Sequence, residues 1–197
     1  PLAEISSWTI LSSGLLLASA SLAVPGNLVV EAPHGDILAS AGGIVQIPLN
    51  GNRTPGGGVR LEAGSRDAAG TVTHAGNIDV SGSGVIGGTV RLEATGDVRG
   101  VLFARENLEV SVGRRVDIEA LATGNARITA GDRVSGTIIG IAGLAASAAD
   151  IDAALLSQDP ATQGKLGSSQ VGFEHGTSAD AASASPSAAT SGSGDRL

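Results

Sequence analysis

The sequence contains two groups of side chains that could do chemistry: three histidines, and a set of charged residues that recurs at a fixed spacing. His34, His74 and His175 are far apart in the chain, and no two of them have the spacing of a metal-binding pair. Pro33 lies between Glu31 and His34 and argues against a helix that would bring these two together. We therefore expect histidines in exposed loops or turns, and we predict no metal, cofactor or catalytic residue.

The charged set contains four members at one constant spacing: Asp79, Asp97, Arg115 and Arg133. Pectin-degrading β-helix enzymes place acidic and basic side chains across neighbouring coils in a similar way. Cleavage of a glycosidic bond needs two carboxyl groups about 5 to 9.5 Å apart and a groove that distorts the sugar. Stacked opposite charges give the same spacing without a groove. The sequence thus favours a protein that is not an enzyme, with a carbohydrate-binding or carbohydrate-cleaving β-helix as the alternative.

The elements that would position these side chains follow from a short repeat between Gly88 and Ala148. Apolar residues fall into three columns with one constant step, namely Val98, Val116 and Val134; Val90, Leu108, Ala126 and Leu144; and Leu92, Val110, Ile128 and Ala146. Within each row apolar and polar residues alternate, which places one set of side chains inside and the other in water. A repeat this short cannot bury its apolar face alone, so it must stack on copies of itself. The sequence predicts an all-β parallel β-helix, or β-solenoid, with coils of about 18 residues.

Charged residues between the apolar positions are predicted to form a ladder with the same step. The ladder comprises Arg91, Glu109 and Arg127, together with Asp97 above Arg115 and Arg99 above Asp117. Adjacent coils of a parallel sheet lie about 4.8 Å apart. Exposed ion pairs across that gap are worth at most about 1 kcal/mol each, so we expect the stability to come from the buried aliphatic columns.

The composition narrows the class of protein. The chain has 197 residues, a net charge of −7, 30 glycines, no cysteine and a single lysine, Lys165. The near absence of aromatic residues argues against a compact enzyme core and suits a narrow interior filled by aliphatic side chains. No basic stripe is present, so we expect neither nucleic acid nor an anionic lipid surface as a partner. The chain starts at Pro1, and we expect a processed or partial product of something longer.

Three parts follow one another along the chain. Residues 1–25 form an apolar cap or assembly segment that lacks the basic start of a signal peptide and is too short for a membrane span. Residues 26–156 form the β-helix, with insertions near 48–57 and 64–75, after which Val80 is expected to rejoin the column of Val98. Residues 157–197 form a Ser/Ala/Gly-rich tail with a short strand near 170–173. Subunit contacts are expected from Leu15, Leu16, Leu17, Val171 and Phe173.

Several rows resemble the repeats of filamentous haemagglutinin-like exoproteins, namely Gly26-Asn27-Leu28-Val29-Val30, Gly76-Asn77-Ile78-Asp79-Val80, Gly88-Thr89-Val90-Arg91-Leu92 and Gly96-Asp97-Val98. The resemblance covers roughly residues 26–156. It implies a right-handed parallel β-helix that is secreted or held on the bacterial cell surface, and that serves as an adhesive stalk or fibre without catalytic residues. Because each end of a solenoid can accept another strand layer, we expect head-to-tail self-association. Host or cell-surface glycans are the other partners that we expect.

Overall fold

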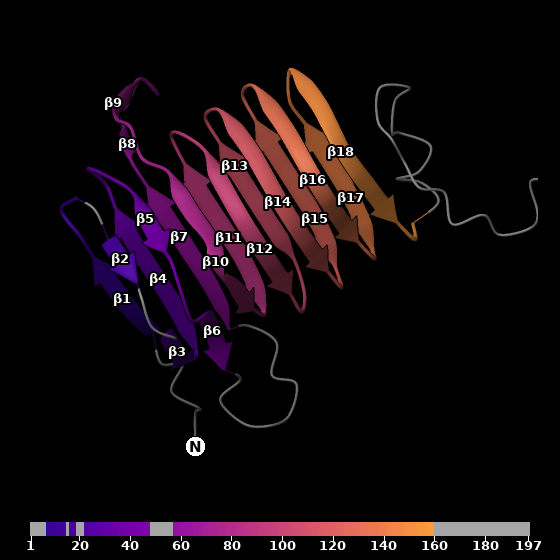
Figure 1. Cartoon of the computed structure of the whole chain (residues 1–197), viewed down its shortest axis with the longest axis horizontal. Helices are drawn as coiled ribbons and strands as arrows, with labels where there is room; N and C mark the ends of the chain where they lie inside the picture. Colours follow the sequence, from indigo (N-terminus) through magenta and orange to yellow (C-terminus); the bar gives the residue numbers. More distant parts are fainter. Residues whose placement is uncertain (1–6, 15, 19–21, 48–56, 160–197) are drawn as a thin grey trace, which may run out of the picture.

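The computed structural model describes residues 7–14, 16–18, 22–47 and 57–159, and in these residues it contains strands and no helix (Figure 1). Sheet A has seven parallel strands in the order β1 (Ser7–Leu11), β4 (Asn27–Ala32), β7 (Gly58–Ala63), β11 (Thr89–Ala94), β13 (Leu108–Val112), β15 (Asn125–Ala130) and β17 (Gly143–Ser147). Sheet B has nine, with the order β18 (Asp150–Ser157), β16 (Arg133–Gly140), β14 (Arg115–Ala122), β12 (Val98–Ala104), β10 (Ile78–Gly87), β5 (Ile37–Ala39) and β2 (Leu16–Ala18), and with β6 (Ile44–Ile47) and β3 (Leu22–Pro25) alongside. Each coil contributes strands to both sheets and stacks on the next coil, which confirms the predicted β-solenoid.

The register of the strands confirms the predicted step over the second half of the solenoid, where coils are about 18 residues apart. Val90 pairs with Leu108, which in turn lies beside Ala126. In sheet B, Val116 lies between Val98 and Val134. Neighbouring coils therefore repeat the same backbone geometry, and each apolar column continues from one coil to the next.

The predicted position of Val80 is wrong. Val98 pairs with Ile78, and Val80 lies beside Gly100, so the step at this point is longer than the regular one. The register then shifts within β10, because Val85 lies beside Leu102 and the step becomes shorter than the regular one. The extra residues are accommodated in a bulge between Val80 and Val85, where Gly84 has a φ of 76°. A bulge of this kind bends a strand without ending it.

The core consists of small and medium aliphatic side chains that point inward from both sheets. Leu61, Leu92 and Val116 have no exposed surface, and alternate residues of each strand are buried in the same way. Full burial of such a side chain contributes roughly 1.5 to 3 kcal/mol. One inward column contains two glycines, Gly100 and Gly136, on either side of Ile118. Their φ values are 143° and 100°. A side chain there would be strained and would clash with the neighbouring strand.

Polar side chains at one corner of the coils satisfy backbone groups of the next coil. The carboxylate of Asp36 accepts from the N–H of Asn77 at 2.7 Å, and the side-chain oxygen of Asn77 accepts from the N–H of Asp97 at 2.8 Å. Asp97 continues the series by accepting from the N–H of Arg115 at 3.2 Å. Backbone N–H groups in turns have no partner in a strand ladder, so they need side-chain acceptors of this kind. These residues have a structural role before any other.

The N-terminal segment contributes three strands to the solenoid. β1 pairs with β4, β2 with β5 and β3 with β6, all parallel. Leu16 and Leu17, which the sequence nominates for assembly, belong to β2, where they pair with Ile37 and Leu38. Leu15, Val171 and Phe173 lie outside the described residues. Within the described strands and loops there is no apolar helix of membrane-spanning length.

Candidate functional site

A β-hairpin interrupts the regular coils where the sequence predicts the second insertion. β8 (Ser65–Arg66) and β9 (Val72–His74) are the one antiparallel pair among the described strands. Gly64, with a φ of 78°, directs the chain out of the coil at the end of β7. Thr95 of the next coil holds the base of the hairpin, because its hydroxyl donates to the carbonyl of His74 at 3.0 Å and accepts from the N–H of Gly76 at 2.9 Å.

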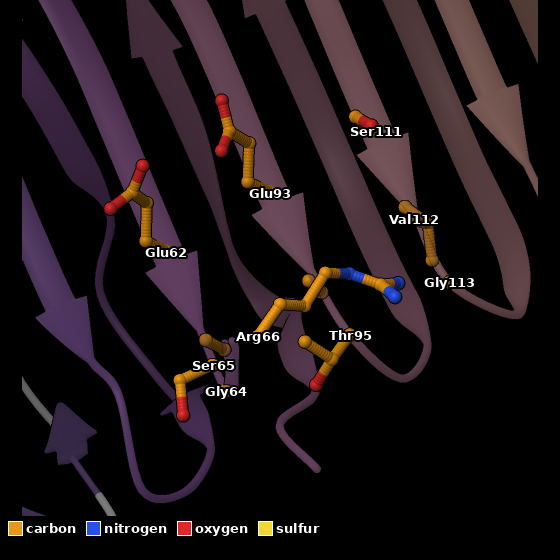
Figure 2. A pocket seen from close by; sticks show the side chains of 11 residues that line it. Glu62, Gly64, Ser65, Arg66, Glu93, Thr95, Ser111, Val112 and Gly113 are labelled. Carbon is orange, nitrogen blue, oxygen red and sulfur yellow. The ribbon is translucent and has the colours of Figure 1, made fainter. Parts of the chain in front are cut away.

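The hairpin and the outer face of sheet A enclose a groove of about 260 Å³. Figure 2 shows the side chains of Glu62 and Glu93 on the strands and that of Arg66 reaching across from the hairpin toward Gly113. Ser65, Thr95 and Ser111 add hydroxyl groups to the lining. The groove is polar, and none of the residues that line it is aromatic.

The carboxylates of the groove belong to a column of three glutamates, because Glu62 lies between Glu31 and Glu93 in register. Arg60 pairs with Glu62, and Arg91 pairs with Glu93 at 2.5 Å. Burial raises the pKa of Glu62; Arg60 opposes this rise and Glu93 adds to it. Glu62 is therefore protonated more readily than a solvent-exposed glutamate.

Arg66 is the one cationic residue among those that line the groove. Its Nη1 donates to the carbonyl of Gly70 at 3.0 Å, and no ion pair to Arg66 occurs in the described part of the chain. A Cβ on Gly113 would come within 3.0 Å of Arg66 Nη2, so the glycine leaves room for the guanidinium. With carboxylates on one side and a guanidinium on the other, the groove could bind a hydroxyl-rich ligand that carries an acidic group.

Of the predicted column Asp79, Asp97, Arg115 and Arg133, the position of Asp79 is wrong, whereas Arg115 forms the expected ion pair with Asp97 at 2.7 Å and lies beside Arg133. The bulge in β10 puts Asp79 beside Arg99, while Arg115 lies beside Arg133, a residue of like charge. Asp79 instead lies in a column that follows Leu38 and continues through Arg99, Asp117, Ser135 and Asp152. The alternative that relied on this column therefore loses its predicted geometry.

A second groove, of about 320 Å³, nevertheless contains Asp79 and Asp97 together with Asp36, Arg99 and Arg114. Arg115 donates to Asp97 through Nη2 at 2.7 Å, and these hydrogen bonds lower the pKa of Asp97. Glycoside cleavage requires one carboxyl group that stays protonated. The Asp97 carboxylate is held in the ionised form, which suits it to the stacking of coils rather than to proton donation.

The remaining members of the predicted charge ladder lie on the outer face of sheet A. Arg91 and Glu109 are neighbours in register and form an ion pair of 3.5 Å, with about half of each side chain exposed. Arg127 follows Glu109 in the same column, but no ion pair joins these two among the described residues. Pairs this exposed contribute little to stability.

Two of the three histidines meet in space, which the sequence does not indicate. The rings of His34 and His74 are 4.2 Å apart between centroids in an edge-to-face arrangement, and His74 Nδ1 lies 3.1 Å from the hydroxyl of Ser65. The hairpin brings His74 back to the coil that carries His34, and no periodicity encodes that return. No group of three or more His, Cys, Asp or Glu side chains in the described ranges could hold a metal ion. His175 lies outside those ranges.

Comparison of the chain with protein-family models, with curated proteins and with solved structures gives no match in any of the three. The resemblance to filamentous haemagglutinin-like exoproteins therefore rests on the residues of the repeat alone. What is established is the all-β solenoid, with its grooves and faces. Any function must be argued from these.

Proposed function

We propose that the chain belongs to a secreted or cell-surface protein of the bacterial outer surface, and that it builds a β-helical fibre or adhesive stalk. The proposal is for a structural protein without enzymatic activity that associates head to tail with copies of itself. Its main support is that both sheets continue through seven coils, with a register shift in β10, and end, within the described residues, on strands with a single neighbour.

The chemistry of those outer strands makes end-to-end association favourable. An edge strand carries backbone N–H and C=O groups that can pair with a further strand. At the end formed by β17 and β18, the inward residues Ala146 and Ile151 are only partly buried, although they pack against the core. A coil from another copy, added at the same spacing of about 4.8 Å, would bury both residues and pair with the backbone of the two outer strands.

Light scattering and negative-stain electron microscopy of the purified chain test this proposal. We expect concentration-dependent rods whose length grows in steps of one solenoid. Ala146→Lys should block growth, because it places an inward charge on the outermost strand of sheet A. Ala145→Lys is the matched control, since Ala145 directly precedes Ala146 in the same strand and faces solvent. A strictly monomeric particle at high concentration, or equal growth of both variants, would contradict head-to-tail association.

Carbohydrate binding is the second candidate, and the groove beneath the hairpin is the observation that favours it. Arg66, Glu62 and Ser111 offer the donors and acceptors that an acidic polysaccharide would require. The groove has no aromatic ring on which a sugar could stack, so we expect binding without strong affinity.

A polysaccharide panel separates the two candidates. Calorimetry would measure binding, while assays for reducing ends and unsaturated products would detect cleavage. If the groove binds an acidic polysaccharide, Arg66→Ala should abolish binding and Arg127→Ala should preserve it, because Arg127 is exposed on the same sheet but does not line this groove. Product formation would contradict the structural proposal. Absence of binding to every member of the panel would remove the carbohydrate candidate.

A further inference from the structure

An apolar stripe runs along the outer face of sheet B through every coil. Its members occupy one outward position of consecutive strands and pair directly with one another: Ala23, Val45, Ile86, Phe103, Leu121, Ile139 and Leu156. These side chains alternate with the buried residues of each strand, and each is exposed or half-buried. Ile86 keeps 37% of its surface exposed, and Val101, in the adjoining outward column, keeps 52%.

The stripe differs in kind from the outward columns of sheet A. One of those columns contains Arg60, Arg91, Glu109 and Arg127, and the next contains three glutamates followed by Ser111 and Thr129. None of the seven positions of the stripe carries a charge. Isolated apolar residues on a surface need no explanation, but an uninterrupted row of them marks an interaction surface.

We propose that this stripe is a lateral interface on which a second copy of the chain packs side by side. The two rods would be related by a two-fold axis parallel to the solenoid axis, so that each stripe residue faces the same residue of the other copy. A partner must present apolar side chains every 4.8 Å or so along the whole rod to match the stripe. Side chains of two sheets that pack face to face interdigitate in this way. The stripe of a second copy has the required spacing, because its coils repeat at the same distance.

The dimensions of the face fit such a pair. The six steps of about 4.8 Å between seven coils give a length of about 29 Å, and three outward columns, each about 7 Å wide, give a width of about 20 Å. Each copy would therefore cover roughly 600 Å², or roughly 1,200 Å² in total, which is at the lower end of the range for specific interfaces. We accordingly expect a dimer with a dissociation constant in the micromolar range.

The charges beside the stripe support the two-fold arrangement. Glu119 is exposed two positions before Leu121, in the column on one side of the stripe, and Arg105 lies in the turn on the other side, two positions after Phe103. A two-fold axis along the stripe exchanges these sides, so that Glu119 of one copy faces the turn at Thr123 of the other, one coil, or about 4.8 Å, from Arg105. An axis parallel to the strands would instead bring the column of Asp79, Arg99, Asp117, Ser135 and Asp152, in which three acidic residues accompany one arginine, against a copy of itself.

Single-cysteine cross-linking tests the arrangement directly, because the chain has no cysteine of its own. Sheets packed about 10 Å apart leave facing Cβ atoms too far apart for a disulfide, so a short bismaleimide is the suitable reagent. Leu121→Cys should give a cross-linked dimer. Ser111→Cys, exposed on sheet A in the same coil, should not. Head-to-tail contacts cannot produce this result, since Leu121 lies on a strand in the middle of the stack.

Sedimentation equilibrium of the full chain measures the strength of the contact from about 1 to about 500 µM. Leu121→Lys should raise the dissociation constant at least tenfold, and Ser111→Lys should leave it unchanged; circular dichroism verifies that both variants fold. Equal dissociation constants for both variants would overturn the proposal, as would equal cross-linking of both cysteine variants. A Leu121→Cys variant that stays monomeric in the presence of the reagent would also overturn it.

Discussion

Replacing Val116 with Asp should disrupt the solenoid, whereas replacing Glu109 with Asp should leave it nearly unchanged. Val116 is fully buried in β14, between the strands that carry Val98 and Val134. Glu109 lies in the adjoining strand of sheet A, with 48% of its side chain exposed, and has one ion pair of 3.5 Å, to Arg91. The two changes thus introduce the same residue type into the same coil, once inside and once outside.

The expected magnitudes differ several-fold. The buried substitution loses roughly 1.5 to 3 kcal/mol of apolar burial and buries a polar group without a partner, at a cost of about 2 to 7 kcal/mol. The total of roughly 4 to 10 kcal/mol is comparable with the whole unfolding free energy of a typical domain. For a chain of this size, about 4 kcal/mol corresponds to a fall in melting temperature of at least about 8 °C. The exposed substitution should cost no more than about 1 kcal/mol, or about 2 to 4 °C.

Thermal unfolding followed by circular dichroism measures both variants beside the parent chain. Because each coil of a solenoid contacts only its neighbours, a central defect should also weaken the coils on either side. Hydrogen exchange should therefore show lost protection in β12 and β16 of the Val116→Asp variant. Equal melting temperatures for the two variants would refute the assignment of stability to the interior columns.

Three further changes test particular contacts. Arg115 holds the pKa of Asp97 below its usual value, so Asp97→Asn should lower the free energy of unfolding in urea at neutral pH by at most about 1 kcal/mol, and the difference should vanish as pH falls below about 3.9 through the folded-state pKa. Burial raises the pKa of Glu62. The raised pKa stabilises the folded state below about pH 4.3, and this stabilisation is lost as pH rises through the folded-state pKa. Glu62→Gln should therefore flatten this part of the profile of stability against pH. Gly136→Ala should lower the melting temperature by several degrees because its φ is 100° and its Cβ would clash with the next strand, whereas Gly43→Ala meets only ordinary contacts at 3.5 Å and should have little effect.

The sequence is sufficient to predict those parts of the structure that repeat. An in-register parallel stack imposes one geometry on every coil, so residues one step apart, such as Val98, Val116 and Val134, must become neighbours once the period is recognised. The larger offset between Val59 and Val90 is also readable, because the rows that contain them are nearly identical. Periodicity thus predicts the fold and most of the core.

Where the coil length varies, the same counting fails. A regular step would place Asp79 beside Asp97, but the bulge after Val80 lengthens the step and places Asp79 beside Arg99. The residues of the bulge, Ser81 to Gly84, are small and polar, and nothing in their type distinguishes a bulge from a turn. The groove is missed for a related reason, because Arg66 comes from an insertion whose fold has no period.

The apolar stripe is visible in the sequence as consecutive apolar residues, which the alternation of apolar and polar residues in a strand does not explain. Runs such as Ile138-Ile139 and Leu155-Leu156 place apolar residues on both faces of a strand, and only one face can be the core. A stack that aligns its inward residues necessarily aligns the outward ones as well, so any outward residue type that is repeated becomes a continuous surface. In sheet A this alignment gives a polar face with paired charges, and in sheet B it gives an apolar row. The two faces of the rod therefore differ in what they can bind, and sheet B is the face on which lateral association should be sought.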